Sequence, residues 1–454
     1  MNQDDARMRD DVIERAGRAI RDDSVPSFIY TDPEVYQLEA ERIFGRSWNF
    51  LAHESEVPNA GDFVVRYILD DSIIVCRGAD GAVRAFLNVC RHRGMQVCRA
   101  EMGNTKRFTC PYHGWLYDNE GALVSVPMER PYFGVDGIDR EANSLSELPS
   151  FDSYEGFLFG SLDTDAEPLR DFLGDFAFYL DIHAKRDPDG LEVVGEPQRW
   201  RLRANWKTGA ENFMGDSYHA QYTHRSVFMI GLHPNTAGDF QAKGSRNGVH
   251  VDAGPGTMSM ARQSAEQRGY TPEMVASFKQ TLPPEQTRLL FEGETPLWPT
   301  RTHLFPNMSM LNAGAYVAKD KLVPFLTCRV WRPLGPEAME VWSWVLVERN
   351  APAWFKRLTQ RAYVLTFGSS GTEEQDDVEN FHGIVRAMRG TASQEIDQTL
   401  AMGRELGPEH TDVDWPAPGS AVGTTFTDAG NRRFMHLWLE GVSGEPVTTT
   451  PAGR

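Results

Sequence analysis

The stretch Asn88–Trp115 reads NVCRHRGMQVCRAEMGNTKRFTCPYHGW and contains three cysteines and two histidines. Its spacing is Cys90-x-His92, then 17 residues, then Cys110-x-x-His113. Thiolate and imidazole are both common metal ligands, and each short segment offers one of each. The spacing therefore predicts two hairpin-like loops that hold one metal centre between them.

Two kinds of centre fit four such ligands: a single structural zinc ion, or a Rieske [2Fe–2S] cluster with two cysteines on one iron and two histidines on the other. Zinc loops usually pair cysteine with cysteine, whereas here each loop pairs a cysteine with a histidine. This division favours the cluster, with Cys90, His92, Cys110 and His113 as its ligands. The other cysteines, Cys76, Cys98 and Cys328, are predicted to be packed thiols.

The residues around these loops predict a small all-β domain over residues 45–160. Short segments rich in β-forming residues alternate there with Gly, Pro, Asn and Asp, and strands are expected over residues 62–68, 72–77, 83–88 and 156–162. Before this domain, helices are expected over residues 4–22 and 32–44, so residues 1–44 are predicted to form a helical segment that packs on the larger domain.

Residues 161–454 are predicted to form an α+β domain on an antiparallel sheet, into which the all-β domain is inserted near the N-terminus. Helices are expected over residues 169–180, 206–219, 353–367 and 374–389, and strands over residues 191–202, 328–333 and 340–348. Residues 234–300 are interpreted as long loops, and the segment from residue 407 as a strap over the surface or a partner.

A second group of possible metal ligands lies in this domain, in the sequence Asp216-Ser-Tyr-His219-Ala-Gln-Tyr-Thr-His224. Two histidines five positions apart cannot face one point from a regular helix, so the helix must kink, bulge or end near residues 220–223. Two histidines with one carboxylate from elsewhere would form the facial triad of non-haem iron oxygenases. The acidic pair Asp376-Asp377 lies later in the chain.

Several segments together resemble the large subunits of Rieske non-haem iron aromatic-ring-hydroxylating dioxygenases, in the branch of the naphthalene and biphenyl enzymes. They are the two-loop block, residues 31–63, CPYHGW (110–115), ENFMGDSYH (211–219), LFPNMSML (304–311) and EQDDVEN (374–380). The disulfide that ties the loops in respiratory-chain Rieske proteins cannot form, because its positions hold Met95 and Tyr112. This departure also points to the oxygenases.

The resemblance implies cofactors and roles for particular residues. A Rieske [2Fe–2S] cluster would feed a mononuclear Fe(II) held by His219, His224 and Asp377, with Asp376 as the alternative third ligand. Asp216 would bridge to His113 of a neighbouring subunit. Asn212, Phe213, Phe228 and Phe367 would line the substrate pocket. Position 373 is usually aromatic in hydrocarbon-oxidising relatives, and Glu373 departs from that pattern. It points away from the pocket, or its loop differs from that of the relatives, or the substrate carries a polar group.

The implied reaction is O₂- and NADH-dependent cis-dihydroxylation of an aromatic ring, with a ferredoxin and a reductase supplying electrons. A small β subunit and an α3β3 assembly are also implied. The same fold would also suit monooxygenation or demethylation. A Rieske electron carrier or a zinc-stabilised binding module is the non-enzyme alternative, but neither needs the second group of ligands. The sequence contains no Gly-rich dinucleotide fingerprint, so NADH is expected to bind another component.

The composition of the chain limits the kinds of partner that it can bind. The chain of 454 residues has 46 basic and 64 acidic side chains and a formal charge of −18, which disfavours nucleic acid and anionic membranes as partners. Five cysteines, no apolar leader and no long apolar stretch predict a cytoplasmic protein. A basic set stands out near the cluster loops: Arg91, Arg93, Arg99, Lys106 and Arg107. It is either a solvated surface or a docking patch for an acidic ferredoxin.

Overall fold

The computed structural model describes residues 3–233, 247–293, 295–411 and 413–444. The chain divides into two compact units. The inserted unit comprises residues 44–169, and the main unit comprises residues 1–43 together with residues 170–454. The chain therefore leaves the main unit once and returns to it once.

The inserted unit is built from three antiparallel sheets, with the orders β5-β4-β3-β6, β10-β11-β2 and β7-β8-β9. The strands are β2 (Asn49–His53), β3 (Asp62–Ile68), β4 (Asp71–Arg77), β5 (Val83–Leu87), β6 (Met102–Asn104), β7 (Arg107–Thr109), β8 (Leu116–Asp118), β9 (Leu123–Ser125), β10 (Ser150–Tyr154) and β11 (Phe157–Ser161). A short helix, α3 (Glu129–Phe133), follows β9. The four predicted strands agree with β3, β4, β5 and β11 to within one residue at each end.

The main unit contains a nine-stranded antiparallel sheet in the order β12-β19-β18-β17-β16-β15-β14-β21, with β13 also paired to β19. Its strands are β12 (Leu191–Val193), β13 (Gln198–Leu202), β14 (Gly248–Ala253), β15 (Gly256–Arg262), β16 (Leu297–Leu304), β17 (Met308–Ala318), β18 (Lys321–Gly335), β19 (Ala338–Glu348) and β21 (Ser420–Val422). A separate pair joins β1 (Ser24–Pro26) to β20 (Asp397–Thr399). A tight turn joins β18 to β19, since Gly335 pairs with Ala338 across it.

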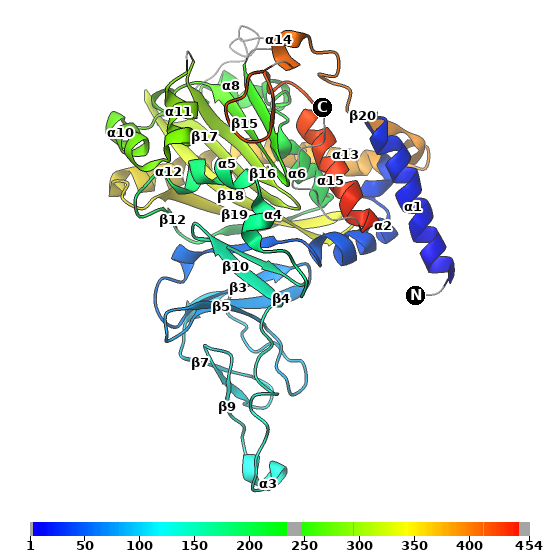
Figure 1. Ribbon diagram of the computed structural model, residues 1–454, viewed down its shortest axis with the longest axis vertical. Coiled ribbons are helices and arrows are strands. Elements are labelled where there is room, and N and C mark those ends of the chain that lie inside the picture. Colours follow the sequence, from blue (N-terminus) through cyan, green and yellow to red (C-terminus); the bar gives the residue numbers. More distant parts are fainter. Residues whose placement is uncertain (1–2, 234–246, 294, 412, 445–454) are drawn as a thin grey trace. The chain divides into compact units, whose positions relative to one another are not determined.

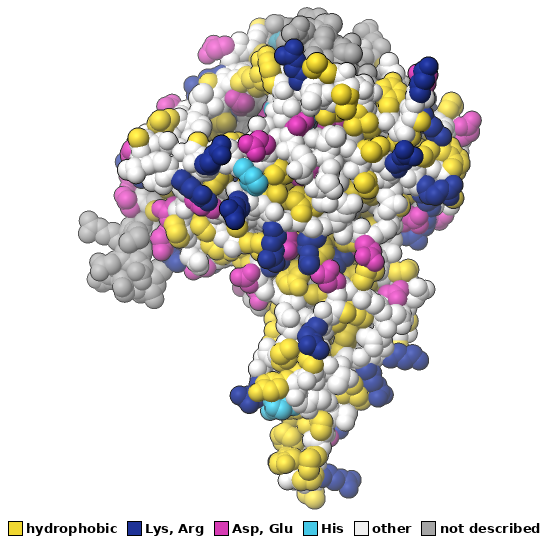
Figure 2. All heavy atoms as spheres, turned by 180° about the vertical axis from the view of Figure 1, so that it is seen from behind, with side chains coloured by type: hydrophobic (Ala, Val, Ile, Leu, Met, Phe, Trp, Pro, Cys, Tyr) yellow, Lys and Arg dark blue, Asp and Glu magenta, His cyan; other side chains and the backbone are white. Residues whose placement is uncertain are grey.

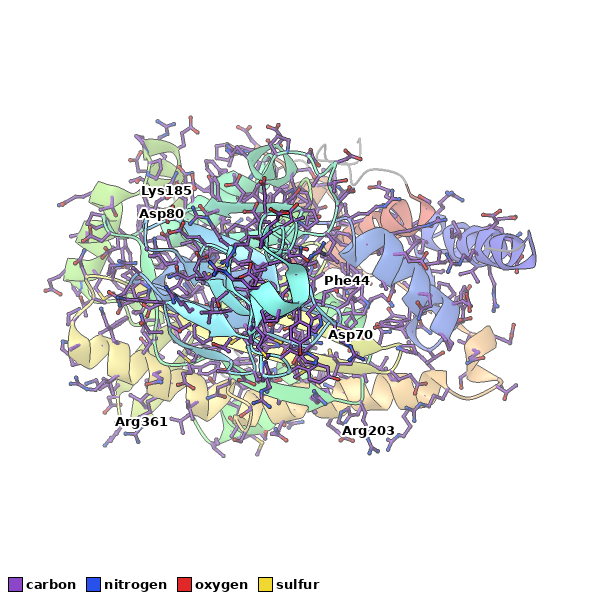
Figure 3. The ribbon with its side chains drawn as sticks, turned by 90° about the horizontal axis from the view of Figure 1, so that it is seen from below. Phe44, Asp70, Asp80, Lys185, Arg203 and Arg361 are labelled. Atoms are coloured by element: carbon purple, nitrogen blue, oxygen red, sulfur yellow. The ribbon has the colours of Figure 1, made fainter. Side chains whose placement is uncertain are left out.

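Helices pack around this sheet. The principal ones are α1 (Gln3–Arg21), α2 (Pro33–Glu39), α5 (Phe176–Ala184), α6 (Trp206–Met214), α10 (Pro272–Thr281), α11 (Pro284–Phe291), α12 (Ala353–Thr366), α13 (Thr372–Met388) and α15 (Ala429–Ser443). Shorter ones are α4 (Leu169–Leu173), α7 (Ala220–Thr223), α8 (Arg225–Met229) and α14 (Pro408–Thr411). Helices from the two ends of the chain, α1 and α15, lie side by side (Figure 1). Seen from below, α12 and α13 follow one another along one edge, with the exposed Arg361 on the outer side of α12 (Figure 3).

Three predicted elements are interrupted in the structure. The expected helix over residues 169–180 is divided into α4 and α5 around Gly174, which has a positive φ of 46°. The expected strand over residues 191–202 is two strands, since Gly195 (φ 76°) and Pro197 separate β12 from β13. The helix expected to reach His219 ends at Met214, before Gly215.

Two loop predictions are wrong for much of their length. Residues 247–300 form β14, β15, α10, α11 and the start of β16, and the C-terminal segment contains the 15-residue helix α15. The strands β14 and β15 are buried at most positions, so they lack the polar alternation that reveals a strand in sequence. The parts of these predictions on residues 234–246, 294, 412 and 445–454 lie outside the described residues. No helix in the described part of the chain has the length and apolar character needed to span a membrane.

Candidate metal centres and pocket

His219 and His224 are brought to one point by a break in the helix that carries them. Helix α6 begins at Asn205, whose side chain accepts a hydrogen bond from the Lys207 backbone N–H at 2.9 Å, and ends at Met214. The short helix α7 then runs from residue 220 to 223, and the two histidines flank it. This is the interruption that their spacing requires.

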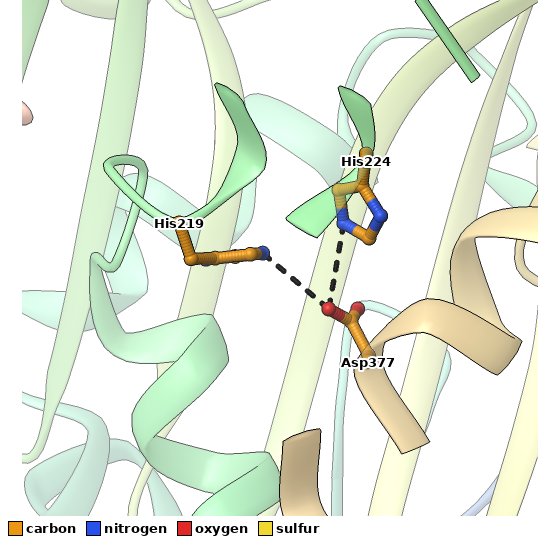
Figure 4. Close-up of side chains that lie close together, drawn as sticks. All are labelled: His219, His224 and Asp377. Carbon is orange, nitrogen blue, oxygen red and sulfur yellow. Dashed lines mark ion pairs between the residues drawn. The ribbon is translucent and has the colours of Figure 1, made fainter. Parts of the chain in front are cut away.

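Asp377 of α13 faces both imidazole rings (Figure 4). Its Oδ1 lies 3.5 Å from His219 Nε2 and 3.4 Å from His224 Nε2. One ligand atom from each residue lies within 4.8 Å of the others, and no other such group of His, Cys, Asp or Glu occurs among the described residues. The donor set is two histidines and one carboxylate, which suits a non-haem iron.

Two further carboxylates orient the imidazoles. Asp376 Oδ2 lies 3.4 Å from His224 Nδ1, and Asp216 Oδ2 lies 3.3 Å from His219 Nδ1. Each ring thus presents Nδ1 to an outer carboxylate and Nε2 to Asp377, an arrangement that fixes ring orientation in metal sites. Asp376 and Asp377 are therefore separated by geometry, because only Asp377 faces both Nε2 atoms.

The side chains around Asp377 have the features of a cation site. Asp377 Oδ1 is buried and makes no hydrogen bond within the described chain. Burial lowers the pKa of His224, but the carboxylates of Asp377 and Asp376 outweigh it and raise the pKa overall. A buried, negatively charged oxygen between two imidazoles is costly unless a cation compensates it, so these residues fit a mononuclear metal ion.

A buried arginine holds α13 in place. Arg329 of β18 donates to Glu374 Oε2 at 2.7 Å and to the Phe367 carbonyl at 2.6 Å. Glu374 lies in the first turn of α13, one turn before Asp377. Arg329 therefore fixes both the start of the helix, through Glu374, and the backbone of Phe367.

The two cysteine-histidine loops of the inserted unit have the same backbone geometry. In the first, the Cys90 N–H donates to the Met95 carbonyl at 2.8 Å, and the Gly94 N–H donates to the Cys90 carbonyl at 2.9 Å. In the second, Cys110 and Trp115, and Gly114 and Cys110, make the same pair of bonds at 2.8 and 3.0 Å. Both glycines have positive φ, 74° and 72°, which a side chain would disfavour.

Within these loops the cysteines are buried and the histidines are exposed. The rings of His92 and His113 have their centroids 4.4 Å apart, and Trp115 stacks on His92. A single zinc ion would draw all four ligand atoms together, yet no three of them lie within 4.8 Å of one another. The loops fit a two-iron cluster instead, with its cysteine side inward.

One hydroxyl group lies close to a cluster cysteine, and two other cysteines nearby are not ligands. The Tyr117 hydroxyl lies 3.3 Å from Cys90 Sγ. Burial raises the pKa of Cys76 to about 12 and also raises that of Cys98, so both thiols remain protonated. All five cysteines are described, and none forms a disulfide.

The predicted basic set is exposed on the inserted unit. Arg91, Arg93, Arg99, Lys106 and Arg107 are all solvent-accessible. Figure 2 shows dark blue side chains over this unit on the face turned to the viewer.

A pocket with a cavity volume of about 110 Å³, partly open to solvent, adjoins the three candidate iron ligands. Its lining includes every residue expected there: Asn212, Phe213, Phe228 and Phe367. Glu373 lines it as well, and burial raises the pKa of Glu373 to about 7. Two arginines of the lining, Arg268 and Arg301, were not foreseen, because neither lies in a recognisable motif.

Comparison with known proteins agrees with both sites. A family model described as Rieske [2Fe-2S] domain matches residues 47–151. One described as ring hydroxylating alpha subunit (catalytic domain) matches residues 183–426. The match to a catalytic domain excludes a simple electron carrier or a zinc-stabilised binding module.

Similar proteins cover nearly the whole chain. The N,N-dimethyl phenylurea N-demethylase subunit alpha of Sphingobium sp. (strain YBL2) is 33% identical, over 98% of this chain and 96% of that protein. The biphenyl dioxygenase subunit alpha of Paraburkholderia xenovorans (strain LB400) is 35% identical, over 93% and 91%. The crystal structure of naphthalene 1,2-dioxygenase from Rhodococcus sp. bound to indole superposes with a TM-score of 0.87 at 42% identity, over 95% and 98%. The chain therefore belongs to the large (α) subunits of Rieske non-haem iron aromatic-ring-hydroxylating dioxygenases, oxidoreductases that use a [2Fe–2S] cluster and a mononuclear iron.

Proposed function

We propose that this subunit performs the cis-dihydroxylation of an aromatic ring in the pocket beside His219, His224 and Asp377. The observation that carries the proposal is the convergence of these three ligand atoms within 4.8 Å, next to a pocket that contains aromatic side chains. Three protein ligands leave coordination positions open, and an iron bound there supplies the activation of O₂.

The protein's own residues position the substrate and the ligands. Phe367 lies close to His224, with ring centroids 6.1 Å apart, and Phe213 and Phe228 add apolar surface that suits a flat ring. Asn212 Nδ2 lies 3.5 Å from His219 Nε2, so its amide can bond polar groups beside the triad. Asp216 and Asp376 hold the imidazoles in the orientation that directs Nε2 inward.

We propose that Cys90, His92, Cys110 and His113 hold the cluster, and that electrons reach the iron from the cluster of a neighbouring copy. Asp216 would bridge to His113 of that copy. Its side chain is 36% exposed, and His113 is exposed as well, so both groups are accessible to a second chain. A carboxylate between two imidazoles orients both rings.

The partners proposed for this subunit are a ferredoxin and an NADH-dependent reductase, with a small β subunit in an α3β3 assembly. The relatives are themselves named as α subunits or as a large oxygenase component, which supports a multicomponent system. The exposed basic set offers a surface for an acidic ferredoxin. Five cysteines without a disulfide support a cytoplasmic location.

The test uses protein purified without oxygen, with iron and sulfide analysis and EPR after reduction with dithionite. We expect about three irons and two sulfides per chain and the signal of a histidine-ligated cluster. Turnover of naphthalene, biphenyl or indole with labelled O₂ should place both oxygen atoms in one product molecule. Zinc without sulfide, or transfer of a single oxygen atom, would contradict the proposal.

Demethylation is the second candidate. One relative, 33% identical over 98% of this chain, is named as an N-demethylase of dimethyl phenylurea. The same labelling experiment separates the two reactions, because N-demethylation releases formaldehyde and leaves the ring unoxidised.

A further inference from the structure

The pocket beside the candidate iron ligands contains two guanidinium groups, of which Arg268 is buried and Arg301 is half-buried. Arg301 comes from β16, and Arg268 closes a short 3₁₀ turn, Glu266–Arg268, that follows β15. Arg268 is only 6% exposed. Removing a charged side chain from water costs free energy, and a hydrocarbon substrate offers no group that would compensate this cost.

Arg268 has no carboxylate partner. Its Nε is buried without a hydrogen bond, and no carboxylate oxygen in the described part of the chain lies within 4.0 Å of its guanidinium. Arg301 donates to the Ser217 hydroxyl, and among the described residues it also lacks an acidic partner within 4.0 Å. Glu373 lines the same pocket but forms no ion pair with either arginine.

Several other buried arginines pair with a carboxylate, and Arg433 donates to the Gly254 carbonyl, whereas Arg268 makes neither contact among the described residues. Arg186 lies 3.2 Å from Glu348, Arg329 lies 2.7 Å from Glu374, and Arg332 lies 2.8 Å from Glu340. A buried charge without a partner is strongly destabilising, so an unpaired arginine in a pocket indicates a ligand that completes it.

The two arginines also influence one another. Burial lowers the pKa of Arg268 to about 10, and the positive charge of Arg301 contributes to that shift. Burial lowers the pKa of Arg301 too, while Asp216 and Asp377 oppose it. Both guanidinium groups therefore line the pocket that the candidate iron ligands adjoin, and their charges act on one another.

We propose that the substrate is an aromatic compound with an anionic oxygen substituent, a carboxylate, which Arg268 binds with the support of Arg301. The inference rests on the proposed function and specifies its substrate class. The planar guanidinium matches the two oxygens of a carboxylate, and the aromatic side chains near His224 hold the ring beside the iron ligands.

The test compares two probes of the same shape, benzoate and benzamide, by titration calorimetry on the holoenzyme. We expect benzoate to bind at least about tenfold more tightly, since hydrogen bonds to charged groups contribute about 1.5–3 kcal/mol. Arg268→Gln should remove that preference and leave benzamide binding within about twofold. Arg288→Gln is the matched control, because Arg288 is exposed on α11 and is not part of the pocket lining.

A second measurement separates a structural role from a binding role. Without an anion, Arg268→Gln should raise the thermal unfolding midpoint, because it removes an unpaired buried charge. Benzoate should raise the midpoint of the wild-type protein but not of the variant. The benzoate–benzamide comparison needs only wild-type protein, so it holds even if the variant fails to fold.

The outcomes separate this inference from the proposed function. Equal affinity for benzoate and benzamide, or a benzoate preference that survives Arg268→Gln, would overturn the inference. If naphthalene is dihydroxylated while benzoate does not bind, the proposed function stands and the inference fails. If benzoate binds through Arg268 but no aromatic compound receives oxygen, the inference stands and the proposed function fails.

Discussion

Three aspartates near the candidate iron site have different tasks, although two are neighbours in sequence. Asp377 faces the Nε2 atoms of both histidines, Asp376 faces Nδ1 of His224, and Asp216 faces Nδ1 of His219. Asp376 and Asp377 project from successive positions of α13, about 100° apart around the helix axis. The two residues are chemically identical, but their side chains point in different directions, and this difference separates their roles.

Asp377→Asn should abolish binding of the mononuclear iron and leave the Rieske cluster intact. The substitution removes the negative charge that lies between the two imidazoles. Iron analysis should fall from about three to about two per chain, with the cluster EPR signal unchanged. Asp376→Asn is the matched control: it should keep the third iron, with an affinity lower by roughly 10- to 100-fold. The reverse pattern would make Asp376 the ligand.

Tyr117→Phe should lower the reduction potential of the cluster without loss of iron. The Tyr117 hydroxyl lies 3.3 Å from Cys90 Sγ, and hydrogen bonds to cluster sulfurs raise the potential. A bond of about 0.5–1.5 kcal/mol corresponds to roughly 20–60 mV for one electron. Redox titration followed by EPR measures the shift. Tyr112→Phe removes a hydroxyl from an exposed ring and should leave the potential unchanged.

At the scale of elements, a buried ion pair ties three helices together. Lys207 of α6 lies 2.5 Å from Glu39 of α2, and Trp438 of α15 donates to the same carboxylate at 2.7 Å. Trp206 donates to its other oxygen at 2.8 Å. The helix that leads to the iron ligands is therefore anchored to segments from both ends of the chain.

Lys207→Met should destabilise the main unit by about 3–5 kcal/mol, because Glu39 would remain buried without its cation. Thermal unfolding should show a clearly lower midpoint. The matched control is Lys356→Met, which breaks the more exposed pair with Glu192 and should cost at most about 1 kcal/mol. Adding Glu39→Gln to Lys207→Met should recover part of the loss. Equal midpoints for the two single variants would refute this account.

The sequence predicted helices and strands correctly where their apolar residues follow a regular spacing. It failed where an element is buried on both faces in the folded protein. Strand β3 and helix α12 follow from alternation and helical spacing, and the break between His219 and His224 follows from helix geometry. Strand β15, with the sequence GTMSMAR, is buried at five of its seven positions, so its polar residues do not mark a face. The hydroxyl groups of its Ser259 and Thr257 make hydrogen bonds in the interior of the protein. A single sequence does not reveal such bonds.

Some residues of the candidate site could also be predicted from the sequence, and others could not. The ligands of both metal centres lie in compact motifs, so spacing and resemblance pointed to them. Arg268 lies in the region that was interpreted as loops, Arg301 lies just after that region, and both line one pocket. Their role depends on the absence of a carboxylate partner, which only the folded chain discloses.

At the scale of the whole molecule, the proposed electron path predicts complementation between damaged chains. A Cys110→Ser chain lacks a complete cluster, and an Asp377→Asn chain lacks the mononuclear iron, so each alone should be inactive. Oligomers assembled from a mixture should regain about a quarter of the wild-type rate, because only one pairing in four joins an intact cluster to an intact iron site. Product formation after co-refolding or co-expression measures it. A mixture as inactive as its components would show that electrons stay within one chain.

The two ends of the inserted unit are tied to each other within that unit. Trp48 Nε1 donates to the Glu167 carbonyl at 2.9 Å, and the Ser161 hydroxyl donates to the Arg46 carbonyl at 3.2 Å. The points where the chain enters and leaves this unit are thus neighbours, as in domains that tolerate insertion into another chain. The inserted unit can consequently be replaced by a related one. Such a replacement would change the reduction potential of the cluster and leave the pocket residues of the main unit unaltered.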